Sequence, residues 1–204
     1  MTLQRLQDGS VRLAQLNEWQ LRTLQSIPLV ADAGDDDDAL RRLFPAPFAA
    51  GEATNEQQED WAELVQPELE DLFETSLARV SKDLKMIELD TSPKEPAELE
   101  HQDEPAAPAR RGRGRSKSRK SATKGESAAP PQELWRLTIP ADHIEDWYRA
   151  MNQARLVLSE KHHAHRTDSA HIARMFISGK MEALIHYELL TGLCGWWVDV
   201  LMRR

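Results

Sequence analysis

The sequence predicts a mainly α-helical fold: a helical bundle with a small antiparallel or mixed β-sheet, interrupted by a disordered insertion. Three observations indicate this class. Large apolar side chains recur at steps of three and four residues in several long stretches, which is the spacing of one helix face. Two shorter stretches alternate apolar and polar residues, as strands with one buried face do. Residues 92–132 follow neither pattern, so we expect residues 1–91 and 133–204 to be two parts of one domain joined by this linker.

Composition excludes several classes of protein. The chain has 204 residues, of which 40% are hydrophobic, enough for one compact domain. Its single cysteine cannot form an intrachain disulfide or a multi-cysteine zinc site, so we expect a cytoplasmic protein. No apolar segment typical of a signal peptide follows Met1. The net charge of −8 argues against nucleic acid as a partner, unless the charge is unevenly distributed along the chain.

The first expected element is a β-hairpin over Leu3–Leu16. Asp8 and Gly9 should form its turn, because an Asp-Gly pair favours the positive φ of a two-residue hairpin loop. In that register Leu6 faces Val11 across the two strands.

A helix should follow the hairpin, with Asn17 as its N-cap. It should end near Ile27, since the residue before Pro28 disfavours the α region. A short helix should then begin at the four aspartates 35–38, whose carboxylates suit the positive end of a helix dipole. The alternative for these aspartates is a Mg²⁺ or Ca²⁺ site, but the segment lacks the spaced ligands and the glycine of a calcium loop.

Two further helices are expected before the linker. Trp61, Leu64 and Val65 lie in the first, and Pro67 suits the first turn of the second. The second helix carries an apolar stripe that we expect to pack against other helices of the domain. The stripe consists of Leu69, Leu72, Phe73, Leu77, Val80, Leu84 and Ile87.

After the linker, Leu134–Ile139 alternates in the way of a strand able to pair with the N-terminal hairpin. A long helix follows, with one apolar stripe made of Ile144, Trp147, Tyr148, Met151, Ala154 and Leu158.

The last segment, Met181–Arg204, is apolar nearly all round, which is typical of a helix at the centre of a bundle or in a membrane. Its longest stretch without charge or histidine, residues 189–198, has ten residues. A membrane span needs about 20 residues. We therefore expect no membrane association and place this helix at the centre of the bundle.

Two pairs of residues in the last segment carry further expectations. Gly192 and Gly195 lower helix propensity, which close backbone approach by a neighbouring helix would explain. Trp196 and Trp197 point to different sides of the helix, so they are candidates for the interface of a homodimer.

Charge is concentrated in the linker. An acidic half is followed by eight cations with no acid among them: Arg110, Arg111, Arg113, Arg115, Lys117, Arg119, Lys120 and Lys124. Outside this basic arm, residues 110–124, the other 189 residues have a net charge of −16. Dense arginine with small spacers neutralises a polyanion without fixed structure, so the arm is a candidate nucleic-acid contact. The alternative is a solvated linker whose cations pair loosely with acidic residues.

Three segments of the chain resemble the landmarks of a known family. They are Leu40-Arg-Arg-Leu-Phe-Pro45, the helix Trp147–Leu158 that begins Trp-Tyr-Arg-Ala-Met-Asn, and the final helix Tyr187–Leu201 with its Trp-Trp pair. Their order is the same as in that family. On these residues the chain resembles the AosR-like family, long described as a domain of unknown function and now named for the actinobacterial oxidative-stress regulator AosR.

The resemblance implies a small cytoplasmic regulator without known enzymatic activity, working through protein contacts in transcriptional control. Some members sense redox state through cysteine pairs. Cys194 is the only cysteine of this chain, so an intramolecular thiol switch is not carried over. On an apolar helix we expect this thiol to be buried with a raised pKa, and an intermolecular disulfide is the alternative.

One cluster of side chains could bind Zn²⁺ or Ni²⁺. It consists of His162, His163, His165 and, further along, His171. Lys161 and Arg166 oppose metal binding, because they add positive charge where the cation would sit.

Three hypotheses for function follow. The first is a non-enzymatic regulatory or adaptor protein with an unidentified protein partner; the second adds nucleic acid bound by the basic arm; the third is a metal-dependent enzyme built on His162, His163 and His165. No Gly-rich phosphate loop, nucleophile elbow or His-Glu-x-x-His motif occurs, so we expect no catalytic residue and no cofactor. Glu182 and His186, four residues apart, should form a structural pair.

Overall fold

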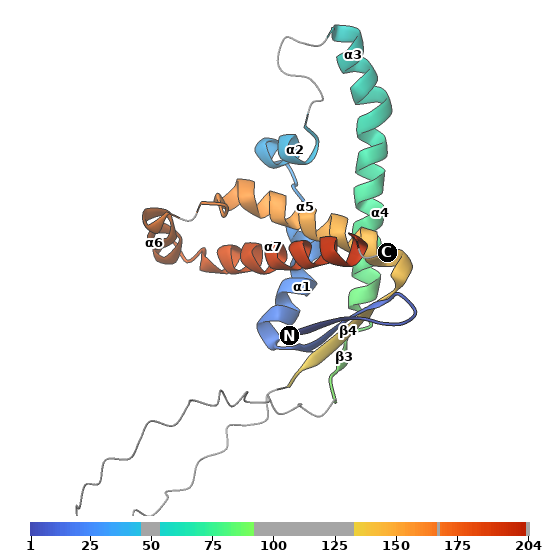
Figure 1. Ribbon diagram of the computed structural model, residues 1–204. Helices are drawn as coiled ribbons and strands as arrows, with labels where there is room; N and C mark the ends of the chain where they lie inside the picture. Colours follow the sequence, from blue (N-terminus) through green and yellow to red (C-terminus); the bar gives the residue numbers. More distant parts are fainter. Residues whose placement is uncertain (46–53, 92–132, 167, 203–204) are drawn as a thin grey trace, which may run out of the picture. The chain divides into compact units, whose positions relative to one another are not determined.

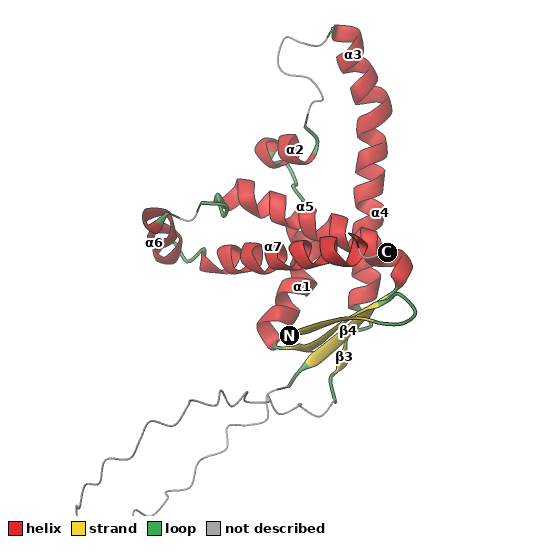
Figure 2. Ribbon diagram, viewed as in Figure 1, coloured by secondary structure: helices red, strands yellow, loops and turns green. Residues whose placement is uncertain are grey.

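The computed structural model describes residues 1–45, 54–91, 133–166 and 168–202 (Figures 1 and 2). Met1–Asp90 and Glu133–Arg204 form one compact unit. In this unit a group of helices lies on one face of a small antiparallel sheet (Figure 2). The predicted fold class, mainly α with a small sheet, is confirmed. The predicted linker, residues 92–132, falls wholly outside the described residues.

Four strands form the sheet in the order β1-β2-β4-β3, every neighbouring pair antiparallel. Their bounds are β1 Thr2–Arg5, β2 Val11–Leu16, β3 Glu88–Leu89 and β4 Trp135–Ile139. Leu13 of β2 lies opposite Leu3 and Leu137, and both Leu13 and Leu137 are fully buried. The expected pairing of the strand after the linker with the hairpin is therefore confirmed. The two-residue β3 was not predicted, because no alternation can show in so short a stretch.

The hairpin loop is one residue longer than expected. Leu6 N–H donates to the Ser10 oxygen at 2.8 Å, and Gly9 N–H donates to the Leu6 oxygen at 3.0 Å. Gly9 has φ +85°, so the loop is a turn followed by a left-handed glycine. Leu6 consequently faces Ser10, and Val11 pairs with Arg5, which corrects the predicted Leu6–Val11 pair.

Helix α1, Glu18–Val30, starts where predicted but ends later. Asn17 caps it: its side chain accepts from Gln20 N–H, and the Gln20 side chain accepts from Asn17 N–H. The helix continues past Pro28, and Ala31 N–H still donates to the Ile27 oxygen at 2.9 Å. Pro28 lies in the last turn, so it removes a single helical hydrogen bond, and core packing of this end outweighs the loss.

Three of the four aspartates lie at the start of α2, Asp37–Leu43, and Asp36 caps it, as predicted for this segment. The Asp36 carboxylate accepts from the N–H groups of Asp38 and Ala39, at 3.1 and 3.0 Å. Asp37 and Asp38 occupy the first turn, where their charge faces the positive end of the helix dipole.

The next two predicted helices are one continuous rod. Helix α3, Asn55–Asp60, runs through a π-helical turn, Trp61–Val65, into α4, Gln66–Leu84 (Figure 1). Gln66 N–H donates to the Trp61 oxygen, five residues back, so the wider turn precedes Pro67 and makes room for a residue without an N–H. Pro67 is in the first turn of α4 as predicted, but it does not separate two helices.

Only the second half of the rod packs as its stripe predicts. Val80 is fully buried, and Leu77 and Leu84 pack against the core. Near the π-helical turn, Leu64 is 63% exposed and Leu72 is 38% exposed. Ile87 lies beyond the end of α4 and packs against the core from there.

Helix α5, Ile144–His162, is the centre of the unit. A single 3₁₀ turn, Ala141–His143, leads into it, and it contacts α1, α2, α4 and α7. Trp147 and Met151 are fully buried. The predicted stripe of this helix is confirmed, but the central position expected for the last segment belongs to α5 instead.

Helix α7, Met181–Met202, lies on one side of α5, with the short α6, Ser169–Ile177, next to its start (Figure 1). Leu190 and Leu193 are buried against the core, whereas Ile185 and Val198 are exposed. One face of α7 therefore stays uncovered within the described chain. None of the helices described is both long and apolar enough to cross a bilayer.

The expectations for the glycines of α7 and for Trp197 are corrected, whereas Trp196 stays a candidate interface residue. A Cβ built on Gly192 or Gly195 meets nothing within 4 Å, so these glycines face open space instead of a neighbouring backbone. Trp197 is fully buried, and its indole N–H donates to the Ile144 oxygen at 2.9 Å, so it is a core residue and not an interface residue. Trp196 is partly buried against the same core.

Two buried carboxylates tie α4 to α5. Asp83 of α4 is fully buried, accepts from the Trp147 indole N–H at 2.9 Å, and lies 3.0 Å from His143 Nδ1. Asp146 of α5 accepts from the Ser76 hydroxyl at 2.9 Å. Both bonds join residues more than 60 positions apart in sequence, so they fix the crossing of the two helices.

Replacing Asp83 should test this crossing. In Asp83→Ala the buried Trp147 N–H loses its acceptor, so the free energy of unfolding should fall by about 1–3 kcal/mol. Urea denaturation followed by circular dichroism measures the change. Asp199→Ala, on the exposed side of α7, is the matched control and should change stability by about 0.5 kcal/mol or less. Equal effects of the two substitutions would contradict the role given to Asp83.

Candidate functional site

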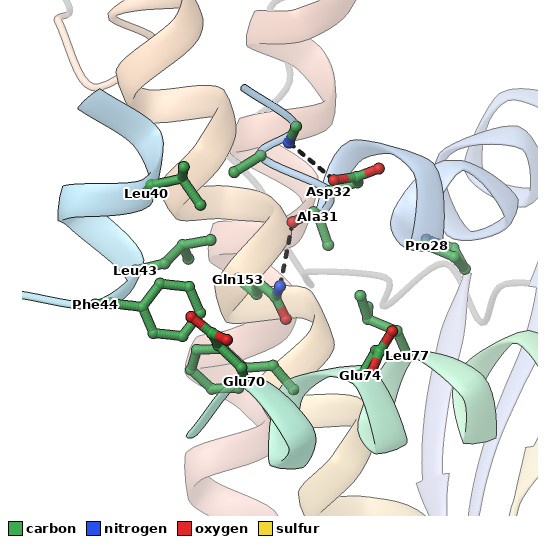
Figure 3. Close-up of a pocket in the computed structure, with 13 residues that line it drawn as sticks. Pro28, Ala31, Asp32, Leu40, Leu43, Phe44, Glu70, Glu74, Leu77 and Gln153 are labelled. Carbon is green, nitrogen blue, oxygen red and sulfur yellow. Dashed lines mark hydrogen bonds between the residues drawn. The ribbon is translucent and has the colours of Figure 1, made fainter. Parts of the chain in front are cut away.

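The strongest candidate site is a hollow of about 480 Å³ beside the rod, which we call the α2–α4 groove (Figure 3). Its volume is in the range of ligand pockets. The end of α1, the helix α2, the second half of the rod and α5 all contribute to it. Its lining residues are Pro28, Ala31, Asp32, Ala33, Gly34, Leu40, Leu43, Phe44, Glu70, Phe73, Glu74, Leu77 and Gln153.

One wall of the groove is apolar and aromatic. The rings of Phe44 and Phe73 lie with their centroids 5.5 Å apart, joining the end of α2 to α4. Both rings pack on a small cluster that includes Leu43 and Val157. These contacts hold α2 against α4 and α5.

The rim of the groove is acidic. Asp32 Oδ1 accepts from Gly34 N–H at 2.8 Å, and Glu70 Oε1 accepts from the Gln66 amide at 2.8 Å. No described cation forms an ion pair with Asp32, Glu70 or Glu74, and no lysine or arginine is among the lining residues. Lys161 Nζ donates to the Asp32 backbone oxygen at 3.2 Å, so a cation lies at the Asp32 end of the rim. Glu70 and Glu74 have no lysine or arginine partner among the described residues.

A polar side chain, Gln153 of α5, lies at the bottom of the groove. Its Nε2 donates to the Ala31 oxygen at 3.2 Å, which fixes the orientation of the amide (Figure 3). Only 7% of the residue is exposed. Its Oε1 is buried and has no hydrogen-bond donor among the described residues. A buried acceptor without a donor is uncommon in folded proteins and needs an explanation.

A second hollow, of about 460 Å³, lies between α4 and α5, and we call it the α4–α5 hollow. Val65, Leu69 and Leu72 give it an apolar side, and its charged residues are of both signs: Arg79 and Arg149 against Glu68, Asp71 and Asp146. With this hollow and the groove, α4 is accessible along two faces.

Asp146 forms the polar base of the α4–α5 hollow, with its side chain 3% exposed. Arg79 Nη1 lies 2.6 Å from Asp146 Oδ2, and Arg149 Nη1 lies 3.1 Å from Oδ1. Burial alone raises the pKa of Asp146. The hydrogen bonds from Arg79 and Ser76, with the charges of Arg79 and Arg149, outweigh burial and hold the pKa below its usual value.

A comparison with protein families identifies the relatives of this chain. The family model described as "Domain of unknown function (DUF2017)" matches residues 3–204. The chain belongs to the DUF2017 family. Searches of curated proteins and of solved structures found no match. The DUF2017 match spans both parts of the helical unit and the segment between them.

The histidine cluster of this DUF2017 chain is not assembled into a metal site. Within the described residues, no group of three or more His, Cys, Asp or Glu side chains is arranged to hold a metal ion. His162 ends α5, and His163 turns the chain with a φ of +50°. His165 Nδ1 lies 2.9 Å from the Ser159 hydroxyl, and His171 is buried in α6. The rings of His163 and His165 meet edge to face with centroids 6.4 Å apart, but no third ligand among the described residues joins them in a metal-binding arrangement.

The remaining candidates from the sequence are Cys194, the Glu182–His186 pair and the basic arm. Cys194 is buried, and burial raises the pKa of its thiol to about 11. Its thiolate is therefore scarce at neutral pH, which fits the expected unreactive thiol. His186 Nε2 lies 3.7 Å from Glu182 Oε1, so the expected pair is present. The basic arm lies outside the described residues, and its role in nucleic-acid binding stays a prediction.

Sequence reasoning missed the polar groups of both hollows. Asp146 and Gln153 lie seven residues apart on the buried face of α5, together with Ala150. A polar residue on the apolar stripe of a helix is the signal that could have found them, because such a residue must meet a partner or a ligand. Glu70 and Glu74 resemble any other solvated helix face, and the sequence offers no signal for them.

The pKa of Asp146 gives a pH dependence with a definite sign. Its folded pKa is below the unfolded value of about 4. The ionised carboxylate therefore stabilises the fold above that pH, and this contribution is lost as the pH falls through the folded pKa. In Asp146→Asn this part of the acid-induced loss should be absent, and stability near pH 7 should be lower by about 1–3 kcal/mol.

The urea concentration at the midpoint of unfolding, measured at pH values from about 2.5 to about 7, reports the effect, because this range spans the pKa values of carboxyl groups. Asp199→Asn removes an exposed carboxylate of α7 and should keep the acid dependence of the native chain. The same acid dependence in Asp146→Asn as in the native chain would contradict the assignment.

Proposed function

We propose that this DUF2017 chain is a non-enzymatic regulatory or adaptor protein that acts by docking another protein on the rod formed by α3 and α4. The observation that carries the proposal is the exposed apolar side of the rod. Leu64, Val65 and Leu72 are all exposed, and Val65 and Leu72 also line the α4–α5 hollow. Apolar side chains grouped on an uncovered helix are typical of protein-interaction surfaces.

The surroundings of these side chains support docking. The two hollows flank the same stretch of α4, so a partner can insert side chains on either side of the helix. The second half of the rod is held in place, because hydrogen bonds of Asp83 and Asp146 join it to α5. A rigid helix that presents apolar anchors loses little entropy when it binds.

The resemblance to the AosR-like family supports a role in transcriptional control, without a thiol switch in this chain because Cys194 has no cysteine partner. A cytoplasmic location belongs to the same proposal, based on the single cysteine. A second copy of the chain is an alternative occupant of the rod, and the experiment below distinguishes it from another protein.

Site-specific cross-linking tests the proposal. A photo-reactive benzoylphenylalanine at Leu64 or at Leu72 of the full chain should capture one defined protein in native lysate. The same group at Gln4, on the exposed edge strand β1, should not capture it. Leu64→Ser combined with Leu72→Ser should reduce recovery of that protein in a pull-down by about tenfold or more.

Mass spectrometry identifies the captured protein, and light scattering shows whether the chain self-associates. Capture of a second copy of the chain would replace the adaptor proposal by a homodimer. A strictly monomeric mass, with no product at Leu64 or Leu72 that is missing at Gln4, would contradict docking on the rod.

A further inference from the structure

We propose that the α2–α4 groove binds an arginine side chain presented by the partner protein. This inference rests on the proposed function, because it names the chemistry of the partner that docks on the rod. Three features of the groove carry it: the carboxylates of Glu70 and Glu74, which have no described cation partner, a buried acceptor without a donor, and an aromatic wall.

The charge of the groove favours a cation. Glu70 and Glu74 line it, and neither pairs with a described lysine or arginine, whereas Lys161 lies at the Asp32 end of the rim. The charge extends along the rod as far as Arg79: residues 55–78 contain eight acidic residues and no lysine or arginine. Such a one-signed surface attracts a basic segment and repels a second copy of itself.

Gln153 supplies an observation that is independent of this charge. Its Nε2 donates to the Ala31 oxygen, and its Oε1, on a side chain that lines the groove, has no donor among the described residues. Leaving such an acceptor buried is unfavourable, and a ligand N–H that donates to it would remove this penalty on binding. The ligand therefore needs an N–H donor that reaches Gln153 at the bottom of the groove and a positive charge close to the carboxylates of the rim.

The walls match the rest of an arginine side chain. Phe44 and Phe73 offer aromatic faces on which a planar guanidinium can stack, and Leu43 and Leu77 can contact its methylene stem. A guanidinium has five N–H donors in a fixed fork, so it can donate to Gln153 and to a carboxylate at once. A lysine ammonium is not planar, so it cannot stack in this way, and it lacks the fixed, forked arrangement of N–H donors.

Peptide binding to the full chain tests the inference. The probe is a fluorescein-labelled peptide of nine residues, glycine and serine around a central Leu-Arg-Leu, and anisotropy reports its binding. In the matched peptide, citrulline replaces arginine, keeping the shape and removing the charge. The arginine peptide should bind about tenfold or more tightly than the citrulline peptide. In NMR spectra, only the arginine peptide should shift the side-chain amide signals of Gln153.

Variants locate the binding in the groove. The exposed pair Glu70→Gln and Glu74→Gln, combined, should weaken binding of the arginine peptide about tenfold. Glu63→Gln, on the π-helical turn outside the groove, removes the same charge from the same rod and should weaken binding by about twofold or less. Gln153→Met should weaken binding about fivefold while the chain keeps its helical circular dichroism.

Several results would overturn the inference. One is equal binding of the arginine and citrulline peptides, and another is an unchanged affinity in the variant that combines Glu70→Gln and Glu74→Gln. A third is binding of free arginine amide as tightly as the peptide, which would indicate a site for a small molecule. If the peptide fails while Leu64 captures a partner, the inference fails and the proposed function stands. If the peptide binds while Leu64 and Leu72 capture nothing, docking on the rod fails instead.

Discussion

The crossing of α4 and α5 is the interaction on which the rest of this structure depends. Asp83 and Asp146 place two carboxylates in a buried interface, and each is satisfied by groups from the other helix. A buried carboxylate without such partners would cost several kcal/mol, so the two helices can meet only in this register. The apolar core could tolerate small shifts, but these hydrogen bonds do not.

The crossing also explains how the first half of the rod keeps its position with few contacts of its own. Helix α4 is fixed to α5 by its second half, so the first half and α3 follow as a continuation of the same helix (Figure 1). The π-helical turn before Pro67 preserves that continuation, because it accommodates the proline without a break. The acidic and apolar side chains of residues 55–78 are thereby held at a defined position beside α2. Both the groove and the hollow are consequences of one helix crossing.

Much of the fold follows from local patterns in the sequence. The hairpin, the strand of residues 135–139, the cap at Asn17 and the stripe of α5 are set by alternation, helical spacing and short-range hydrogen bonds. Where a prediction from local sequence was wrong, tertiary contacts determined the observed structure. Core packing carried α1 past Pro28, and the apolar surface of α7 suggested a central helix although α5 takes that place. The candidate site was not predictable, because Glu70, Glu74 and Gln153 become one site only when α4 and α5 cross.

The central claim is that the crossing of α4 and α5 holds the rod in a fixed position beside α2. The most direct measurement is the distance between spin labels at Glu63 on the π-helical turn and Arg41 on α2, by double electron–electron resonance in a Cys194→Ala background. The account predicts one narrow distance distribution in the native chain, which broadens in Asp146→Ala and stays narrow in Asp199→Ala. A broad distribution in the native chain, or one that Asp146→Ala leaves unchanged, would contradict the claim.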